Sequence, residues 1–118
     1  WTLIRWRGAV TSAIRGHKGQ AFLREMAAAM DAMPAKRLID GHLVKDGEVC
    51  AIGSVCVARG IDTANVDPGC PEAVAALVGI ARALAAEIEY INDDFIESPE
   101  NRWDRVREWV TENTRTGS

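Results

Sequence analysis

The fold is decided by residues 46–60, which read Asp46-Gly47-Glu48-Val49-Cys50-Ala51-Ile52-Gly53-Ser54-Val55-Cys56-Val57-Ala58-Arg59-Gly60. The Asp-Gly pair is typical of a type I′ turn, so we expect a small hairpin that pairs His42–Val44 with Glu48–Cys50. A short apolar helix follows over Cys50–Arg59. The stretch therefore predicts a strand-to-helix joint at Cys50, and Gly53 is expected to let another helix cross closely.

Apolar periodicity and capping residues predict five more helices. Prolines and glycines mark several of their ends, and Ser98-Pro99 is a strong signal for a helix start. The expected ranges are Leu3–Ile14, Gln20–Met33, Pro71–Val78, Ile80–Ile91 and about 99–113. We therefore predict a mostly α fold, a compact domain of five to six helices with a small hairpin at about 38–50, which spans residues 1–118 as one unit.

The composition limits the class of protein. The chain has 118 residues, of which 47% are hydrophobic, and this is enough to bury a core without disulfides or metals. No apolar run reaches the roughly 18 to 20 residues of a membrane helix. Three cysteines without a CxxC pair and two histidines do not form a zinc motif, and an odd number of thiols fits a reducing cytosol. We expect a cytoplasmic protein with no metal and no cofactor.

Charge is unevenly distributed, although the net charge is only −3. Residues 1–24 carry five basic side chains and no acid, whereas residues 83–101 carry six acids and no base. Such segregation indicates either two binding faces or two segments that attract each other. The acids of the second segment do not follow the spacing of an EF-hand, so no metal site is predicted there.

Cys50 is the candidate for catalysis. A thiol at a helix N-terminus is favoured as a thiolate, and His42 across the hairpin could act as its base, oriented by Asp46 or Asp94. This reading predicts a thiol-dependent hydrolase or transferase. The alternative is that Cys50 is a small buried side chain at the joint, since free cysteine is among the most buried residue types.

The basic N-terminal segment is the candidate for binding. Arginines interleaved with tryptophans can contact phosphates and stack on bases, which predicts a weak nucleic-acid binder. The same residue types are common anchors of protein interfaces, so a protein partner explains them equally well. The residues concerned are Trp1, Arg5, Trp6, Arg7, Arg15 and Lys18.

Several pieces of the chain resemble known groups of small proteins. Glu48–Gly53, running on to Ala58-Arg59-Gly60, resembles the Cys-Ala-x-Gly helix of small bacterial and actinobacterial domains. Ile91-Asn92-Asp93, followed by Ser98-Pro99-Glu100 and Arg105–Trp109, resembles their later Asn-Asp and Arg-Val segment. The pieces Arg5–Val10 and Gly19–Glu25 look like small proteins of phage and prophage genomes. Together these pieces cover most of the chain, but none is the signature of a reaction.

The resemblance implies an accessory protein of the kind that phages carry, which binds and blocks host machinery, including defence systems such as CRISPR–Cas. We therefore expect a non-enzymatic protein that binds a host protein or a protein–nucleic acid complex in the cytoplasm of a bacterial host. Its contact surfaces are expected at the basic N-terminus and at the acidic pair Asp93 and Asp94. If the two bacterial motifs belong together, Asn92 and Asp93 should also accept hydrogen bonds from the N–H groups that begin the Cys50 helix.

Overall fold

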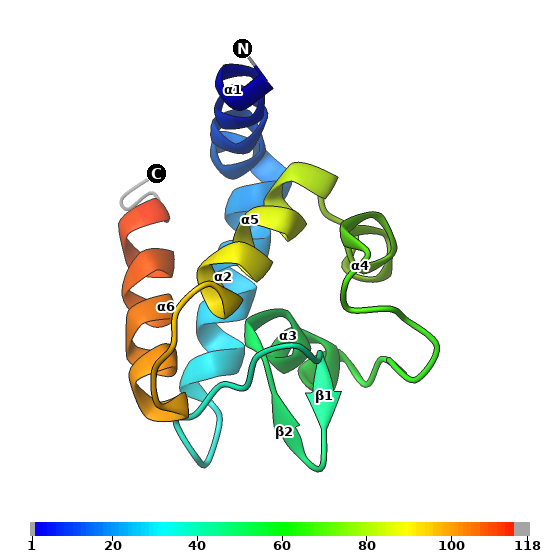
Figure 1. Cartoon of the computed structure of the whole chain (residues 1–118), viewed down its shortest axis with the longest axis vertical. Coiled ribbons are helices and arrows are strands. Elements are labelled where there is room, and N and C mark those ends of the chain that lie inside the picture. Colours follow the sequence, from blue (N-terminus) through cyan, green and yellow to red (C-terminus); the bar gives the residue numbers. More distant parts are fainter. Residues whose placement is uncertain (1, 115–118) are drawn as a thin grey trace.

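Residues 2–114 form six α-helices and one β-hairpin in the computed structural model, which describes the backbone of these residues and the side chains from residue 7 onward (Figure 1). The mostly α fold is thereby confirmed. The elements are α1 (Thr2–Arg15), α2 (His17–Asp31), β1 (Val44–Lys45), β2 (Glu48–Val49), α3 (Ala51–Arg59), α4 (Pro71–Val78), α5 (Arg82–Asp93) and α6 (Pro99–Asn113). None of these helices is both long and apolar enough to cross a membrane.

Two helices organise the packing. α2 lies in the middle of the molecule and contacts α1, α3 and α6, while α5 contacts α1, α3 and α4 (Figure 1). Their apolar faces meet in one continuous core, in which Met26 and Met30 of α2 are fully buried as filler. The core side chains of α5 and α6 are Leu84, Ile88, Val106 and Val110.

The hairpin has the predicted turn. Asp46 and Gly47 adopt positive φ values of 53° and 80°, as both central residues of a type I′ turn must. The strands are shorter than expected, because only Val44 with Val49 and Lys45 with Glu48 are paired. Beyond them the Cys50 N–H donates to the Leu43 carbonyl at 3.0 Å, and α3 then begins, so the ladder cannot continue.

α3 begins and ends where the sequence predicts, with Cys50 as its N-cap and Gly60 in the left-handed conformation at φ 71°. The prediction that Gly53 admits another helix is wrong. A Cβ at this position would lie 1.8 Å from the carbonyl oxygen of Leu43, so the close neighbour is the chain that leads into β1. The hairpin therefore folds back directly onto the first turn of α3.

α2 begins earlier than predicted. Gly16 is its N-cap, and Gly19, which lies between the expected ranges Leu3–Ile14 and Gln20–Met33, is inside the helix. A Cβ at Gly19 would lie 1.8 Å from the carbonyl oxygen of Ala13. This glycine is therefore required by the close crossing of α1 over α2.

The last two helices, α5 and α6, agree with their predicted ranges to different degrees. The range of α6 is as predicted, and the Ser98 hydroxyl accepts from the Asn101 N–H at 3.1 Å. α5 begins and ends two residues later than predicted. Asn92 and Asp93, which follow the predicted helix end at Ile91, consequently belong to the last turn of α5.

Candidate functional site

The joint between the hairpin and α3 is closed by hydrogen bonds. Cys50 Sγ accepts from the Gly53 N–H at 3.3 Å, and Asn92 Oδ1 accepts from the Ala51 N–H at 3.0 Å. These are two of the first N–H groups of α3, which have no partner within the helix. The joint thus uses Cys50 and Asn92 as capping residues.

The structure does not support a thiolate at Cys50. Burial raises the pKa of this thiol to about 12, since its bond from Gly53 opposes the desolvation only in part, and the nearby Asp93 carboxylate raises the pKa further. The prediction of a thiolate favoured by the helix terminus is therefore wrong. Loss of water around the sulfur outweighs the partial positive charge of the terminus.

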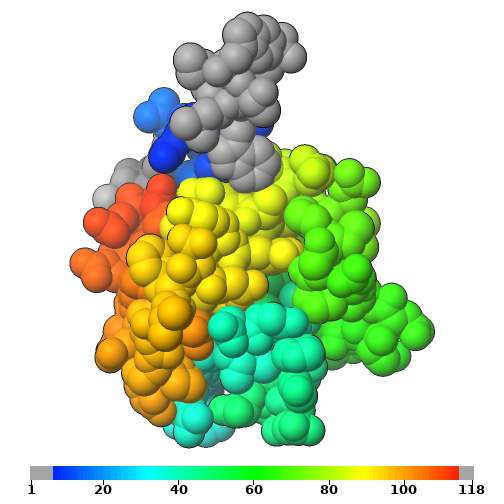
Figure 2. Space-filling view, viewed as in Figure 1, coloured from blue at the N-terminus to red at the C-terminus, as the bar shows by residue number. Residues whose placement is uncertain are grey.

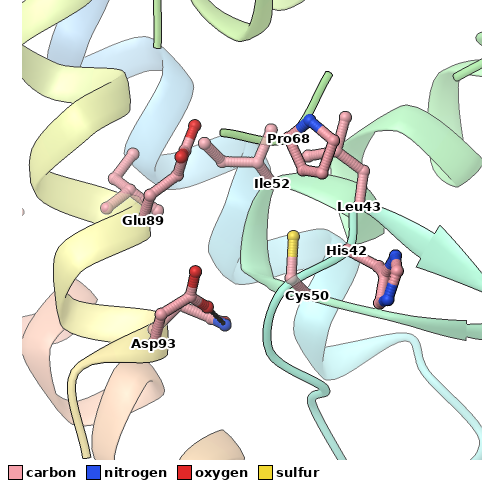
Figure 3. Close-up of a pocket in the computed structure, with 9 residues that line it drawn as sticks. His42, Leu43, Cys50, Ile52, Pro68, Glu89 and Asp93 are labelled. Atoms are coloured by element: carbon pink, nitrogen blue, oxygen red, sulfur yellow. Dashed lines mark hydrogen bonds between the residues drawn. The ribbon is translucent and has the colours of Figure 1, made fainter. Parts of the chain in front are cut away.

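His42 lies near Cys50 without pairing with it. Both residues line one small cavity, but the imidazole points away from the sulfur and is exposed (Figure 3). The cavity has a volume of about 10 Å³, which is room for about one water molecule and not for a substrate. Asp46 lies in the exposed hairpin turn, so no observation favours the thiol-dependent reaction.

Asn92 is the central residue of this joint. Besides accepting from Ala51, its Nδ2 donates to the Ile39 carbonyl at 2.9 Å and to Asp93 Oδ1 at 2.7 Å. The expected bond from Asn92 to the start of α3 is confirmed. Asp93 does not contribute in the way we predicted, because its carboxylate accepts from Asn92 and not from α3.

Arg102 completes the joint, and the sequence analysis did not identify it. Its guanidinium is buried and donates to three backbone carbonyls, those of Asn92 at 2.9 Å, Leu38 at 3.1 Å and Phe95 at 3.3 Å. Nη2 also lies 3.7 Å from the Asp40 carboxylate. The available signal was its spacing: residues 102, 106 and 110 share one face of α6, so this arginine occupies an otherwise apolar stripe.

The joint buries polar side chains, whereas the segment after it exposes apolar ones. Among the described residues, the exposed large hydrophobic side chains are Val57, Tyr90, Phe95 and Ile96, so three of them lie within seven residues. We call Asp93, Asp94, Phe95 and Ile96, together with Tyr90, the acidic tip. Tyr90 and Asp93 belong to the end of α5, and the other three residues lie in the α5–α6 connection, which is on the face seen in Figure 2, in yellow to orange.

Arg105 of α6 holds the acidic tip in place. The Arg105 guanidinium stacks 4.1 Å from the centroid of the Phe95 ring and also pairs with Glu97. That contact holds the pKa of the Glu97 carboxyl below its usual range. Asp94 raises the pKa of the Tyr90 hydroxyl by hydrogen bonding and by its charge. Within the described residues, neither Asp93 nor Asp94 takes part in an ion pair.

The basic N-terminal residues are only partly brought together. Arg7 lines a groove of about 790 Å³ between α1, α5 and α6, opposite Glu87, Tyr90 and Trp109. Arg15 and Lys18 are exposed at the junction of α1 and α2. Trp1 lies outside the described residues, as do the side chains of Arg5 and Trp6, whose backbone is part of α1.

Residues 2–114 contain no group of three or more His, Cys, Asp or Glu side chains that could hold a metal ion. Comparison of the chain with protein-family models, with curated proteins and with solved structures found no match.

Proposed function

We propose that this chain is an accessory protein of phage or prophage type, which acts in the host cytoplasm by binding a host macromolecule through the acidic tip. One observation carries the proposal: exposed apolar side chains gather beside two carboxylates, Asp93 and Asp94, for which the described residues provide no ion-pair partner. Isolated exposed hydrophobic residues are ordinary, but a cluster of them marks a surface used for interaction.

The acidic tip suits binding because it is held in place. Arg102 donates to the Phe95 carbonyl, and Arg105 stacks on the Phe95 ring. A surface that is already ordered loses little conformational entropy when a partner binds. Ile96 and Tyr90 can therefore serve as anchors without rearrangement of the backbone.

The charge of the tip favours a basic protein surface. Two unpaired carboxylates attract lysine and arginine side chains and repel phosphates. The basic residues Arg15 and Lys18, which a nucleic acid would need, lie at the junction of α1 and α2 and not at the tip. A protein, or the protein part of a protein–nucleic acid complex, is therefore the proposed partner.

The finer form of the proposal is inhibition of a host defence system such as CRISPR–Cas. It is supported by the resemblance of Arg5–Val10 and Gly19–Glu25 to phage proteins, and by the simple requirement of an inhibitor for a complementary surface. No reaction is needed for such an activity.

The test uses the protein as bait in lysate of a bacterial host, with and without nuclease. The variant Phe95→Ser/Ile96→Ser removes the apolar part of the tip, and Val57→Ser removes an exposed apolar side chain on α3 as a matched control. We expect a stoichiometric protein partner that survives nuclease, binds the control and is lost with the tip variant. A partner retained by the tip variant, or one released by nuclease, contradicts the proposal.

A further inference from the structure

Glu89 has one carboxylate oxygen, Oε1, that is enclosed by protein and has no hydrogen-bond partner among the described residues. It projects from α5 into the cavity of about 10 Å³ beside the Cys50 joint. Figure 3 shows Glu89 and Asp93 of α5 on one side of this cavity and Leu43, Cys50 and Pro68 on the other.

The charged groups around Glu89 disfavour its ionised form. Asp93 lies one turn further along the same helix, and Asp67 comes from the segment between α3 and α4. His42 and Cys50 also line the cavity, and no ion pair with Glu89 occurs within the described residues. Burial, followed by the charges of Asp93 and Asp67, raises the pKa of Glu89 to about 7.

The middle of the connection between α3 and α4, residues 62–69, makes only local hydrogen bonds among the described residues. Its ends are tied to the helices, because the Ile61 N–H donates to the Cys56 carbonyl at 2.9 Å and the Cys70 carbonyl accepts from the Val74 N–H at 3.1 Å. Its internal hydrogen bonds are local: Val66 N–H donates to the Thr63 carbonyl, and Cys70 N–H donates to the Asp67 carbonyl. The Gly69 N–H likewise donates to Asp67 Oδ1 at 2.8 Å. What holds the segment over the cavity is packing, to which Pro68 contributes.

We propose that Glu89 is a pH-sensitive contact that controls this segment. In its uncharged form it lets residues 62–69 close over the cavity, and in its ionised form it drives them away from α5 and opens the cavity to Cys50. The proton comes from solvent and stays on the carboxyl. Its O–H can then donate a hydrogen bond to a neighbouring carboxylate. After the proton leaves, the half-buried Glu89 carries a negative charge near those of Asp67 and Asp93, and outward movement of the segment restores water to its enclosed oxygen Oε1. This inference is independent of the proposed function.

The experiment compares alkylation of Cys50 by iodoacetamide in the wild type and in Glu89→Gln, which keeps the shape and cannot ionise. Peptide mapping separates Cys50 from Cys56, which is fully buried within α3 and reports opening of the whole helix. We expect equal Cys50 rates in the two proteins at pH 6. At pH 8.5 we expect a rate at least about tenfold higher in the wild type, because each pKa unit of difference between two arrangements shifts their populations tenfold.

Two control variants separate Glu89 from its neighbours. Glu87→Gln removes a carboxylate of α5 that lines the other groove, and His42→Asn removes the imidazole beside the cavity. Both should retain the pH-dependent labelling of the wild type. In the wild type itself, a carbon-detected NMR titration should find the Glu89 carboxyl changing charge near neutral pH.

The following results would overturn the proposed role of Glu89. A Glu89 carboxyl that titrates at an ordinary value overturns it. So does a Cys50 labelling rate that is equal in wild type and Glu89→Gln at pH 8.5, or one that rises only together with that of Cys56.

Discussion

Asn92 and Ile96 lie four residues apart and reverse the usual placement of polar and apolar side chains. Asn92 is 1% exposed, whereas Ile96 is fully exposed. Asn92 is buried because it bonds the start of α3, the Ile39 carbonyl and Asp93. A polar side chain can be buried when it completes the hydrogen bonds of the backbone around it. An apolar side chain that remains outside contributes nothing to the core and is available to a partner.

The largest effect is expected when the buried joint loses Arg102. Arg102→Met keeps the apolar stem but leaves the carbonyls of Asn92, Leu38 and Phe95 without their donor. We expect the free energy of unfolding to fall by about 3 kcal/mol or more, because each buried acceptor left unpaired costs about 1 to 3 kcal/mol. Urea denaturation followed by circular dichroism measures this change.

The control for Arg102 lies on the same helix. Arg107 pairs with Asp31 near the surface, so Arg107→Met should cost less than about 1 kcal/mol. Equal losses in the two variants would show that the buried arginine is not the centre of the joint.

A smaller loss is expected at Asn92 itself. Asn92→Ala removes the acceptor for the Ala51 N–H and the donor to the Ile39 carbonyl, so we expect a loss of about 2 kcal/mol. Asp93→Ala should cost less than about 1 kcal/mol, because Asp93 accepts only from Asn92 in this joint. Thermal unfolding of the two variants tests the order, and a larger loss for Asp93→Ala would contradict it.

The sequence predicted those parts of the fold that local signals determine. α4 and α6 have the expected ranges, because proline near the first position and Ser98 at the cap act within one turn. The type I′ turn at Asp46 and Gly47 is equally local. The bond from Asn92 to α3 followed from the need of a helix start for acceptors.

The rest depended on distant contacts. Gly19 lies between the ranges predicted for the first two helices, although the close approach of α1 places it within α2. The helix terminus alone favoured a thiolate at Cys50, whereas the structure bears out the alternative of a buried side chain at the joint. Arg102 was missed although its spacing placed it in the apolar stripe of α6, because its partners are the carbonyls of Asn92 and Phe95 and that of Leu38, which is distant in the sequence. The spacing shows where the arginine lies but not what it binds.

The next largest effect is a pH dependence of the free energy of unfolding, which comes from Glu89. Its folded-state pKa of about 7 lies above the ordinary value of 4.5, so the folded protein binds the proton more tightly than the unfolded chain. The associated stability is fully present below pH 4.5 and is lost as the pH rises to about 7. Glu89→Gln should not lose it. Because the Glu89 side chain is half-exposed, solvent screening reduces the effect of the pKa shift, and the difference between the unfolding free energies of the two proteins should change by about 1 to 2 kcal/mol from pH 4 to pH 8. Denaturation at a series of pH values measures this difference, and a constant difference would contradict the prediction.

The smallest effect on stability is expected at Ile96, the other half of the comparison. Ile96→Ser changes a side chain that is fully exposed and that buries no surface in the fold, so the free energy of unfolding should change by less than about 0.5 kcal/mol. Chemical denaturation beside Asn92→Ala provides the contrast. A loss at Ile96 as large as that at Asn92 would mean that the acidic tip packs on the protein itself. A negligible loss is what the proposed role of Ile96 as an anchor for a partner requires, because such a side chain must be free of contacts within the fold.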